Sequence, residues 1–471
     1  MTLSPMDDGR RTTDHASRRL PRGPRSAVHG HVAALALALL ATTAASAQGA
    51  EYKARTGTFA LTDCRIETVT RGTVERGTVV IEDGRITAVG EASVPAGATE
   101  VPCDGGTVYP GMIDAGTRLG LVEVGSVAET QDVDEIGDVT PQMEALTAVN
   151  PSTIHVPITR LSGVTTTLSV PQDGLMPGTA ALVNLHGYTP DQMAAGFEGV
   201  VLNSPSSGRR GPWDRREQSA IDKAYQDAVD ALDEVWDEAV LYARIDSARQ
   251  AGRSTDAMPY QPELAALMPV VRGERALLVE ANAAADIAKA IEWLEDKDVR
   301  AVLMGAAEGW RVADRIAEAG LSVLTGPVTG LPTRASDRYD RTYQNAALMA
   351  REGVQVALRT DDRMQNYRNL PFHAGFAVAY GEEVGFTRED ALEAVTINPA
   401  RIFGVDDRLG SVEVGKSATL FIADGDPFEP ATEVTAVFID GYRIPLVSRQ
   451  TELYDEYLRR QPGLNAVGDA E

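Results

Sequence analysis

Acidic side chains and arginines form the candidate site that the sequence offers. Glu280, Asp361 and Asp362 each follow a short apolar run that is typical of a buried strand. Brought together, their carboxylates could hold a hard cation such as Mg²⁺ or Ca²⁺. They could equally pair with Arg118 or Arg359. We favour an ion pair between Arg118 and Asp361, because a buried carboxylate needs a partner and a guanidinium offers two parallel hydrogen bonds.

Histidines are scarce in this chain. Of the six, only His155, His186 and His373 lie beyond residue 47. His186 follows an expected strand and could face the opening of a site, and His373 lies at the start of an expected helix. A role in ligand binding and a role as a hydrogen-bonded packing residue stay open for both. His155 precedes Val156-Pro157 and is expected to be structural.

The elements that must position these residues follow from the hydrophobic pattern. Residues 57–107 alternate in short β runs, with Asp83-Gly84 as a hairpin turn. From residue 108 strands and helices alternate, which predicts an α/β fold with a parallel sheet and right-handed crossovers. After Gly404 the β pattern returns, and we expect the two β stretches to pair in one sheet. The expected strands of the α/β part are 162–170, 179–185, 276–279, 301–304, 321–324 and 353–358, and the expected helices are 286–294, 311–319, 343–351 and 390–396.

An insertion at 203–261 interrupts this alternation. Its residues 218–250 carry apolar side chains at helical spacing, which predicts a long amphipathic helix or a helical pair. We expect it to pack on the outer wall of the α/β part. A helix that binds a partner protein is the alternative.

The N-terminal segment resembles a secretory signal. Six arginines between Arg10 and Arg25 precede the apolar run 32–41, and Ala45-Ser46-Ala47 provides small residues for cleavage. We expect cleavage before Gln48 and a periplasmic or secreted protein. Arg18-Arg19 leaves the twin-arginine route open, and an uncleaved membrane anchor is the alternative to cleavage. The apolar run is too short for a stable membrane span.

Composition narrows the class of partner. The 44 basic and 68 acidic side chains give a formal net charge of −24, which disfavours nucleic acid because phosphates would be repelled. The only cysteines, Cys64 and Cys103, could form a disulfide in an oxidising compartment or remain two buried thiols.

Several segments together resemble the amidohydrolase superfamily, in its imidazolonepropionase-like branch. They are GTVVIEDGRITAVG (77–90), VYPGMIDA (108–115), LPFHAGFAVAYG (370–381), AVTINPARIFGVDDRLGSVEVGKSATLFIADGDP (394–427) and VFIDGYR (437–443). The resemblance implies a (β/α)8 barrel of the TIM type with a composite β-sandwich domain. Its implied bounds are 1–47 for the signal peptide, 48–107 and 405–447 for the sandwich, 108–404 for the barrel and 448–471 for a C-terminal tail.

The resemblance also implies a metal site, which this sequence alters. Members of the superfamily bind divalent metals through His-x-His on strand one, histidines on strands five and six, and an aspartate on strand eight. The matching positions here are Gly116, Arg118, Glu280, Gly305 and Asp361. Glycine has no side chain and a guanidinium has no lone pair to donate. We therefore predict no metal ligand and assign no cofactor, with a divalent metal as the alternative.

The resemblance implies hydrolysis of a cyclic or non-peptide C–N bond in a small molecule. The roles carried over are a catalytic one for Asp361 and substrate binding for Arg118, His186, Glu280 and His373. The alternative is a catalytically degenerate barrel that binds a ligand or serves as the partner subunit of an active, paralogous amidohydrolase. A homo-oligomer is a further expectation.

Overall fold

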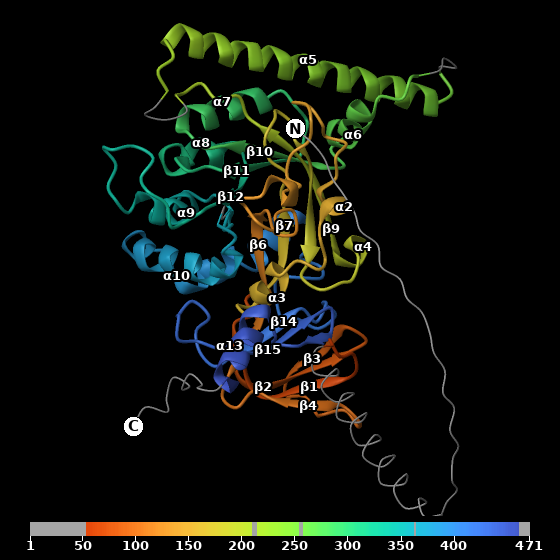
Figure 1. Cartoon of the computed structure of the whole chain (residues 1–471), viewed down its shortest axis with the longest axis vertical. Helices are drawn as coiled ribbons and strands as arrows, with labels where there is room; N and C mark the ends of the chain where they lie inside the picture. Colours follow the sequence, from red (N-terminus) through yellow and green to blue (C-terminus); the bar gives the residue numbers. More distant parts are fainter. Residues whose placement is uncertain (1–52, 210–213, 254–257, 362–363, 461–471) are drawn as a thin grey trace, which may run out of the picture. The chain divides into compact units, whose positions relative to one another are not determined.

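The computed structural model describes residues 53–209, 214–253, 258–361 and 364–460. The predicted signal peptide with its cleavage site lies outside the described residues, as do Asp362, parts of the insertion and the end of the predicted tail. The described residues from Ala54 to Arg460 belong to one compact unit (Figure 1). Among the described residues, no helix is both long enough and apolar enough to cross a membrane.

Strands from both ends of the chain pair in one eight-stranded sheet. Its order is β16-β15-β14-β5-β1-β2-β3, with β4 also paired to β1. The two ends of the chain meet where β5 pairs antiparallel with β14, Tyr109 opposite Phe421. The composite β-sandwich stays a prediction. The strands are β1 (Phe59–Glu67), β2 (Thr73–Glu82), β3 (Arg85–Gly90), β4 (Thr99–Pro102), β5 (Thr107–Pro110), β14 (Leu420–Ala423), β15 (Val434–Ile439) and β16 (Tyr442–Ile444).

Local chemistry explains the first hairpin of this sheet. Asp83 and Gly84 join β2 to β3 with φ of 48° and 78°. A two-residue hairpin turn needs positive φ at both positions, and Asp-Gly tolerates it well. The predicted hairpin is therefore confirmed.

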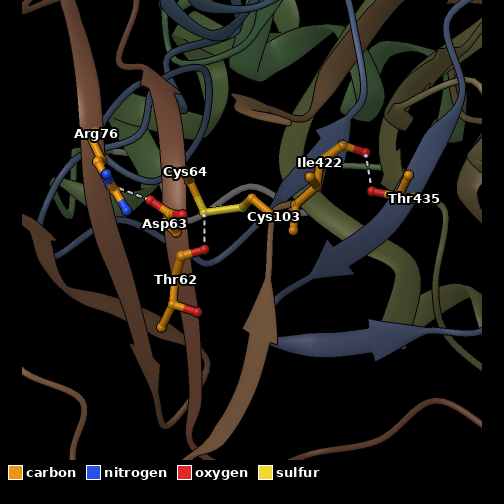
Figure 2. The surroundings of a disulfide bond; sticks show 7 residues. All are labelled: Thr62, Asp63, Cys64, Arg76, Cys103, Ile422 and Thr435. Carbon is orange, nitrogen blue, oxygen red and sulfur yellow. Dashed lines mark hydrogen bonds and ion pairs between the residues drawn. A yellow bond between two sulfur atoms is a disulfide. The ribbon is translucent and has the colours of Figure 1, made fainter. Parts of the chain in front are cut away.

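A disulfide joins Cys64 of β1 to Cys103, which follows β4 (Figure 2). Both cysteines are buried in one apolar cluster with Ile422 of β14. Of the two alternatives for these cysteines, the structure has the disulfide. The same cluster contains Leu420 and Phe438, so residues from both ends of the chain surround the bond.

The second sheet curls into a nearly closed barrel of eight strands. The order is β6-β7-β8-β9-β10-β11-β12-β13, and the end strands meet where the Asp361 N–H donates to the Gly116 carbonyl over 3.1 Å. Most residues of its strands are buried, as expected for a barrel covered on its outside. The strands are β6 (Met112–Thr117), β7 (Val164–Ser169), β8 (Gly178–Asn184), β9 (Ala194–Asn203), β10 (Ala276–Ala281), β11 (Ala301–Gly305), β12 (Ser322–Thr325) and β13 (Val356–Leu358).

One barrel strand runs against the others. β8 pairs antiparallel with both β7 and β9, so the prediction of a parallel sheet is wrong for this strand. A parallel crossover needs about a dozen residues or more, usually with a helix. The link 170–177 is shorter and carries no helix, so the chain can only turn back. The other neighbouring pairs in this sheet are parallel.

Helices follow most of the later barrel strands and cover the outside. The insertion forms one helix, α5, which packs on α7 through Trp236 and Trp293, ring centroids 5.5 Å apart (Figure 1). The helices are α2 (Ala145–Ala148), α3 (His155–Arg160), α4 (Pro190–Met193), α5 (Gln218–Gln250), α6 (Pro262–Val271), α7 (Ala284–Leu294), α8 (Ala313–Glu318), α9 (Arg341–Arg351), α10 (Leu370–Gly381), α11 (Arg388–Ala394), α12 (Ile397–Phe403) and α13 (Arg449–Arg459). Short 3-10 turns are η1 (Ala128–Thr130), η2 (Gly309–Arg311), η3 (Tyr367–Asn369) and η4 (Glu382–Val384).

Two details refine the expected bounds. The chain changes sheet at Gly111: β5 before it belongs to the composite sheet and β6 after it to the barrel. The predicted tail contains α13, which begins after a capping box formed by Ser448 and Thr451. The division into domains as such stays a prediction.

Candidate functional site

A polar cavity of about 300 Å³ opens where the barrel strands end. We call it the mouth cavity. The carboxyl ends of barrel strands are where TIM-type barrels carry their sites. β6, β9, β10 and β13 contribute side chains or backbone at or just past their last residues. Its lining includes Gly116, Asn203, Glu280, Asn282, Met304, Arg359 and Asp361.

The guanidinium of Arg359 is the central group of this cavity. Arg359 directly follows β13, and its side chain is 4% exposed. One of its terminal nitrogens, Nη2, lies 3.0 Å from Glu280 Oε1 and 3.3 Å from Asp361 Oδ2. Burial alone would lower the pKa of Arg359, but attraction by Asp361, Glu280 and Asp114 outweighs it, so the pKa is raised. The arginine is therefore a fixed cation between two carboxylates.

Gly116 leaves the space that this arginine uses. A Cβ atom at position 116 would lie 2.9 Å from Cδ of Arg359, closer than carbon atoms approach without a shift. Gly116 does not have positive φ, so its backbone conformation does not require glycine. The close approach of the Arg359 side chain, and not the backbone conformation, therefore explains the glycine at position 116.

Asp114 is a fully buried carboxyl group beside the cavity, one that sequence reasoning did not single out. It accepts hydrogen bonds from Thr360 Oγ1 (2.6 Å), the Thr360 N–H (3.0 Å) and the Gly116 N–H (3.3 Å). Burial raises the pKa of Asp114 to about 7, although these hydrogen bonds oppose the shift. The only sequence signal was an acid inside an otherwise apolar strand.

The structure brings together Glu280 and Asp361 but not Arg118. Arg118 follows β6, is partly buried and makes no ion pair within the described part of the chain. The favoured pair between Arg118 and Asp361 is therefore wrong. Asp361 pairs instead with Arg359, which also lies just past the end of β13.

His186 lies at the opposite end of the barrel from the cavity. Because β8 runs against its neighbours, the residues after it emerge next to the composite sheet. The His186 ring contacts Tyr442, with centroids 4.8 Å apart, and the nearby Asn184 donates to Asp440. Its pKa is lowered, mainly by burial and also by Arg160. The expectation that His186 faces the mouth is wrong.

His373 is a buried residue of α10 that does not line the mouth cavity. The Val328 N–H donates to its Nδ1 over 3.4 Å, and Thr329 Oγ1 lies 3.5 Å from Nε2. These contacts hold the loop after β12, which fits the packing alternative. His155 likewise has a backbone partner, the Glu123 carbonyl, 3.1 Å from its Nε2.

The donor set at the mouth does not fit a transition metal. Within the described ranges, no three His, Cys, Asp or Glu side chains are grouped to hold a metal ion. Zinc sites use imidazole, thiolate and carboxylate ligands, and a guanidinium between the two carboxylates would repel the ion. At Gly305, where φ is +79°, a Cβ would lie 2.4 Å from Glu280 Oε1 and from Asn282 Oδ1, so a histidine there would strain the backbone and displace both side chains.

Comparisons with known proteins agree with this architecture. The sequence model of the Amidohydrolase family matches residues 281–444. An imidazolonepropionase of Syntrophobacter fumaroxidans is 36% identical over 112 residues, which cover 23% of this chain and 24% of the relative. An N-substituted formamide deformylase of Arthrobacter pascens is 28% identical over 160 residues, 30% of this chain and 29% of the relative. The matched stretches thus span about a quarter of these curated relatives.

Solved structures extend the likeness to the whole fold. The crystal structure of an amidohydrolase from Thermotoga maritima superimposes with a TM-score of 0.72 at 23% identity, covering 83% of this chain and all of that one. Molinate hydrolase superimposes with a TM-score of 0.52 at 18% identity, covering 83% of this chain and 95% of that one. The chain therefore carries the sequence pattern of the Amidohydrolase family over residues 281–444, and it shares its fold with solved amidohydrolases.

Proposed function

We propose that this protein is an exported amidohydrolase-fold protein that binds a small ligand at its barrel mouth and has no hydrolytic metal centre. The observation that carries the proposal is the position of Arg359 between Glu280 and Asp361. A metal-bound water needs a site whose ligands neutralise the ion and leave one position open. Here a permanent cation occupies the space between the carboxylates, so we derive no hydrolytic step through a metal.

Ligand binding is supported by the chemistry of the mouth cavity. About 300 Å³ of space is lined by Glu280 and Asp361, which accept hydrogen bonds, and by the amides of Asn203 and Asn282. A few convergent polar groups in a concave site are typical of small-molecule binding. A small, polar molecule fits this lining better than an apolar one.

Export is supported by two features of the N-terminal half. The segment before Gln48 has the basic, apolar and small-residue parts of a secretory signal. The Cys64–Cys103 disulfide is a bond that persists in oxidising compartments. Cell fractionation with N-terminal sequencing tests this: we expect Gln48 as the first residue and protein outside the cytoplasm. A cytoplasmic product that keeps Met1 would contradict it.

Hydrolysis of a cyclic or non-peptide C–N bond without a metal is the second candidate. The matched relatives include an imidazolonepropionase and an N-substituted formamide deformylase, and Asp361 reaches the cavity as a partly exposed carboxylate. In this case Asp361 would act as the catalytic carboxylate. The same barrel could also serve as the partner of an active homologue.

Elemental analysis of the purified protein tests the proposal. We expect less than one transition-metal ion per chain after exposure to Zn²⁺. One or two tightly held ions per chain would overturn the proposal. The matched variant combines Gly116→His with Arg359→Gly, which together with Glu280 and Asp361 supplies three ligands and removes the cation. That variant should bind more Zn²⁺ than the unchanged chain.

A screen for binding and turnover separates the two candidates. The compounds are N-acyl amino acids, dipeptides and hydantoin-type rings. Binding by calorimetry without product formation supports the proposed function. Turnover that is lost in Asp361→Ala would establish the hydrolase instead.

A further inference from the structure

A second hollow lies far from the strand ends, beneath the insertion helix. This groove, about 540 Å³, is bounded by α5, the end of α6 and the loop after α7. We call it the α5 groove. Its floor is apolar and consists of Trp236, Val240 and Ala243 of α5 together with Val271 and Val299. It is larger than the mouth cavity and shares no lining residue with it.

Basic side chains edge this apolar floor, although the chain as a whole carries a net charge of −24. The charged residues that line the groove are Arg244, Arg253, Arg272 and Lys297, with the carboxylates of Asp296 and Asp298. Arg272 is compensated by Asp246 at 2.7 Å. Arg244 makes no ion pair within the ranges that the structure describes. Four cationic side chains face three carboxylates, Asp246, Asp296 and Asp298, so the groove carries a net charge of +1, against the sign of the molecule.

Lys297 is held in place beside the floor. Its side chain is 13% exposed, and its Nζ donates to the Trp293 carbonyl over 2.7 Å and lies 4.2 Å from the centre of the Trp293 ring. Its nearest carboxylate, Asp296, is 3.4 Å away but 86% exposed, where water screens the attraction. Lys297 thus offers a preorganised ammonium group at the end of an apolar surface.

We infer that the α5 groove binds a small organic anion with an apolar body, of the class of medium-chain or aromatic carboxylates. Ligand sites of this size are mostly apolar, with a few charged groups that fix the orientation of the ligand. The apolar body would cover Trp236 and Val240, and the carboxylate would meet Lys297 and Arg244. A cationic amphiphile of the same length would place like charges together.

This site goes beyond the proposed function, because the insertion supplies one wall of the groove and none of the mouth residues takes part. Either site can therefore exist without the other. The exposed surface of α5 could also contact a protein, but the groove has the volume of a small-molecule site.

Isothermal titration of the full mature chain with decanoate tests the inference. We expect saturable binding of about one decanoate per chain, at least about tenfold tighter than decyltrimethylammonium. Acetate, which lacks the apolar body, should not bind measurably. Equal affinity for the two decyl compounds, or no saturation by decanoate, would overturn the inference.

Single substitutions assign the binding to this groove. Arg244→Gln and Lys297→Gln should each weaken decanoate binding about tenfold, because each removes a charged partner of the carboxylate. Arg249→Gln is the matched control, since Arg249 is an exposed arginine of the same helix that does not line the groove. If all three variants bind like the unchanged chain, the site lies elsewhere and the inference is wrong. Thermal melts by circular dichroism verify that the variants are folded.

Discussion

At the scale of single residues, Gly116 and Arg359 fit each other. Gly116→Ala would place a Cβ 2.9 Å from Arg359 Cδ, so we expect a loss of about 1–3 kcal/mol in the free energy of unfolding, the usual cost of overpacking. In an Arg359→Ala background this cost should disappear, because the colliding atom is absent. Urea denaturation of the four proteins in the double-mutant cycle measures the coupling.

Another glycine provides the control for this cycle. At Gly208 an added Cβ would meet only the hydroxyl of Ser206, 4.0 Å away, and its φ is not positive. Gly208→Ala should change stability by less than about 0.5 kcal/mol. An equal cost of Gly116→Ala with and without Arg359 would show that the arginine is not what position 116 accommodates.

Asp114 predicts a pH dependence of stability. Its pKa in the folded protein is about 7, above the value of an unfolded aspartate, so the folded state holds a proton that the unfolded state has lost. The contribution of Asp114 to the free energy of unfolding is largest below the pKa of the unfolded state. It falls as the pH rises toward 7 and no longer changes above pH 7. A shift of this size corresponds to about 4 kcal/mol over that range.

Asp114→Asn isolates this contribution from that of other carboxyl groups. The amide stays neutral at every pH, so the variant should lose less stability than the unchanged chain between pH 5 and pH 7.5. Urea midpoints at the two values measure the difference. If both proteins change equally, Asp114 is ionised in the folded state across this range.

Sequence reasoning located part of the mouth at this scale. Glu280 and Asp361 were predicted from the resemblance to the amidohydrolase superfamily, and both line the cavity. The choice between Arg118 and Arg359 depends on which side chain turns inward, and residue types do not contain that information. Asp114 was missed because its partners, Thr360 above all, are distant in sequence.

At the scale of elements, the type of a strand was easier to predict than its direction. The run that became β8 was recognised from its β-branched and apolar residues, but not as antiparallel. The direction follows from the length of the link 170–177, which is too short for a crossover. That one reversal also moved His186 from the mouth to the opposite end of the barrel.

The disulfide between β1 and the end of β4 should contribute measurably to stability. It closes a loop with a sequence separation of 39 residues, for which the loss of chain entropy in the unfolded state amounts to about 4 kcal/mol. The Cys64→Ala/Cys103→Ala variant should lose this amount and some packing, because both side chains are buried. Reduction of the wild-type protein with dithiothreitol breaks the disulfide but keeps both sulfur atoms. The reduced protein therefore shows the effect of losing the cross-link without the effect of losing packing. Unchanged urea midpoints on reduction would contradict a stabilising bond.

At the scale of the whole molecule, the two ends of the chain depend on each other. β5 lies between β1 and β14, and Tyr109 of β5 stacks on the buried Phe421 of β14 with ring centroids 5.3 Å apart. Phe421 also fills space beside Gly163, which immediately precedes β7 of the barrel. Removal of the C-terminal strands would expose β5 and open the end of the barrel that faces the composite sheet.

A chain that ends after Gly404 should therefore not reach the native state, although it contains every barrel strand. We expect a broad thermal transition by circular dichroism and rapid cleavage by trypsin. Co-expression of residues 405–460 should restore resistance, because the missing strands can pair with β5 in trans. A chain that ends after Ser448 is the control: it lacks only α13 and the residues after it, and α13 has no buried residue, so its melting temperature should stay within a few degrees of the full chain. If the shorter fragment melts as sharply as this control, the barrel folds without the composite sheet, and the pairing of the two chain ends is not what holds the molecule together.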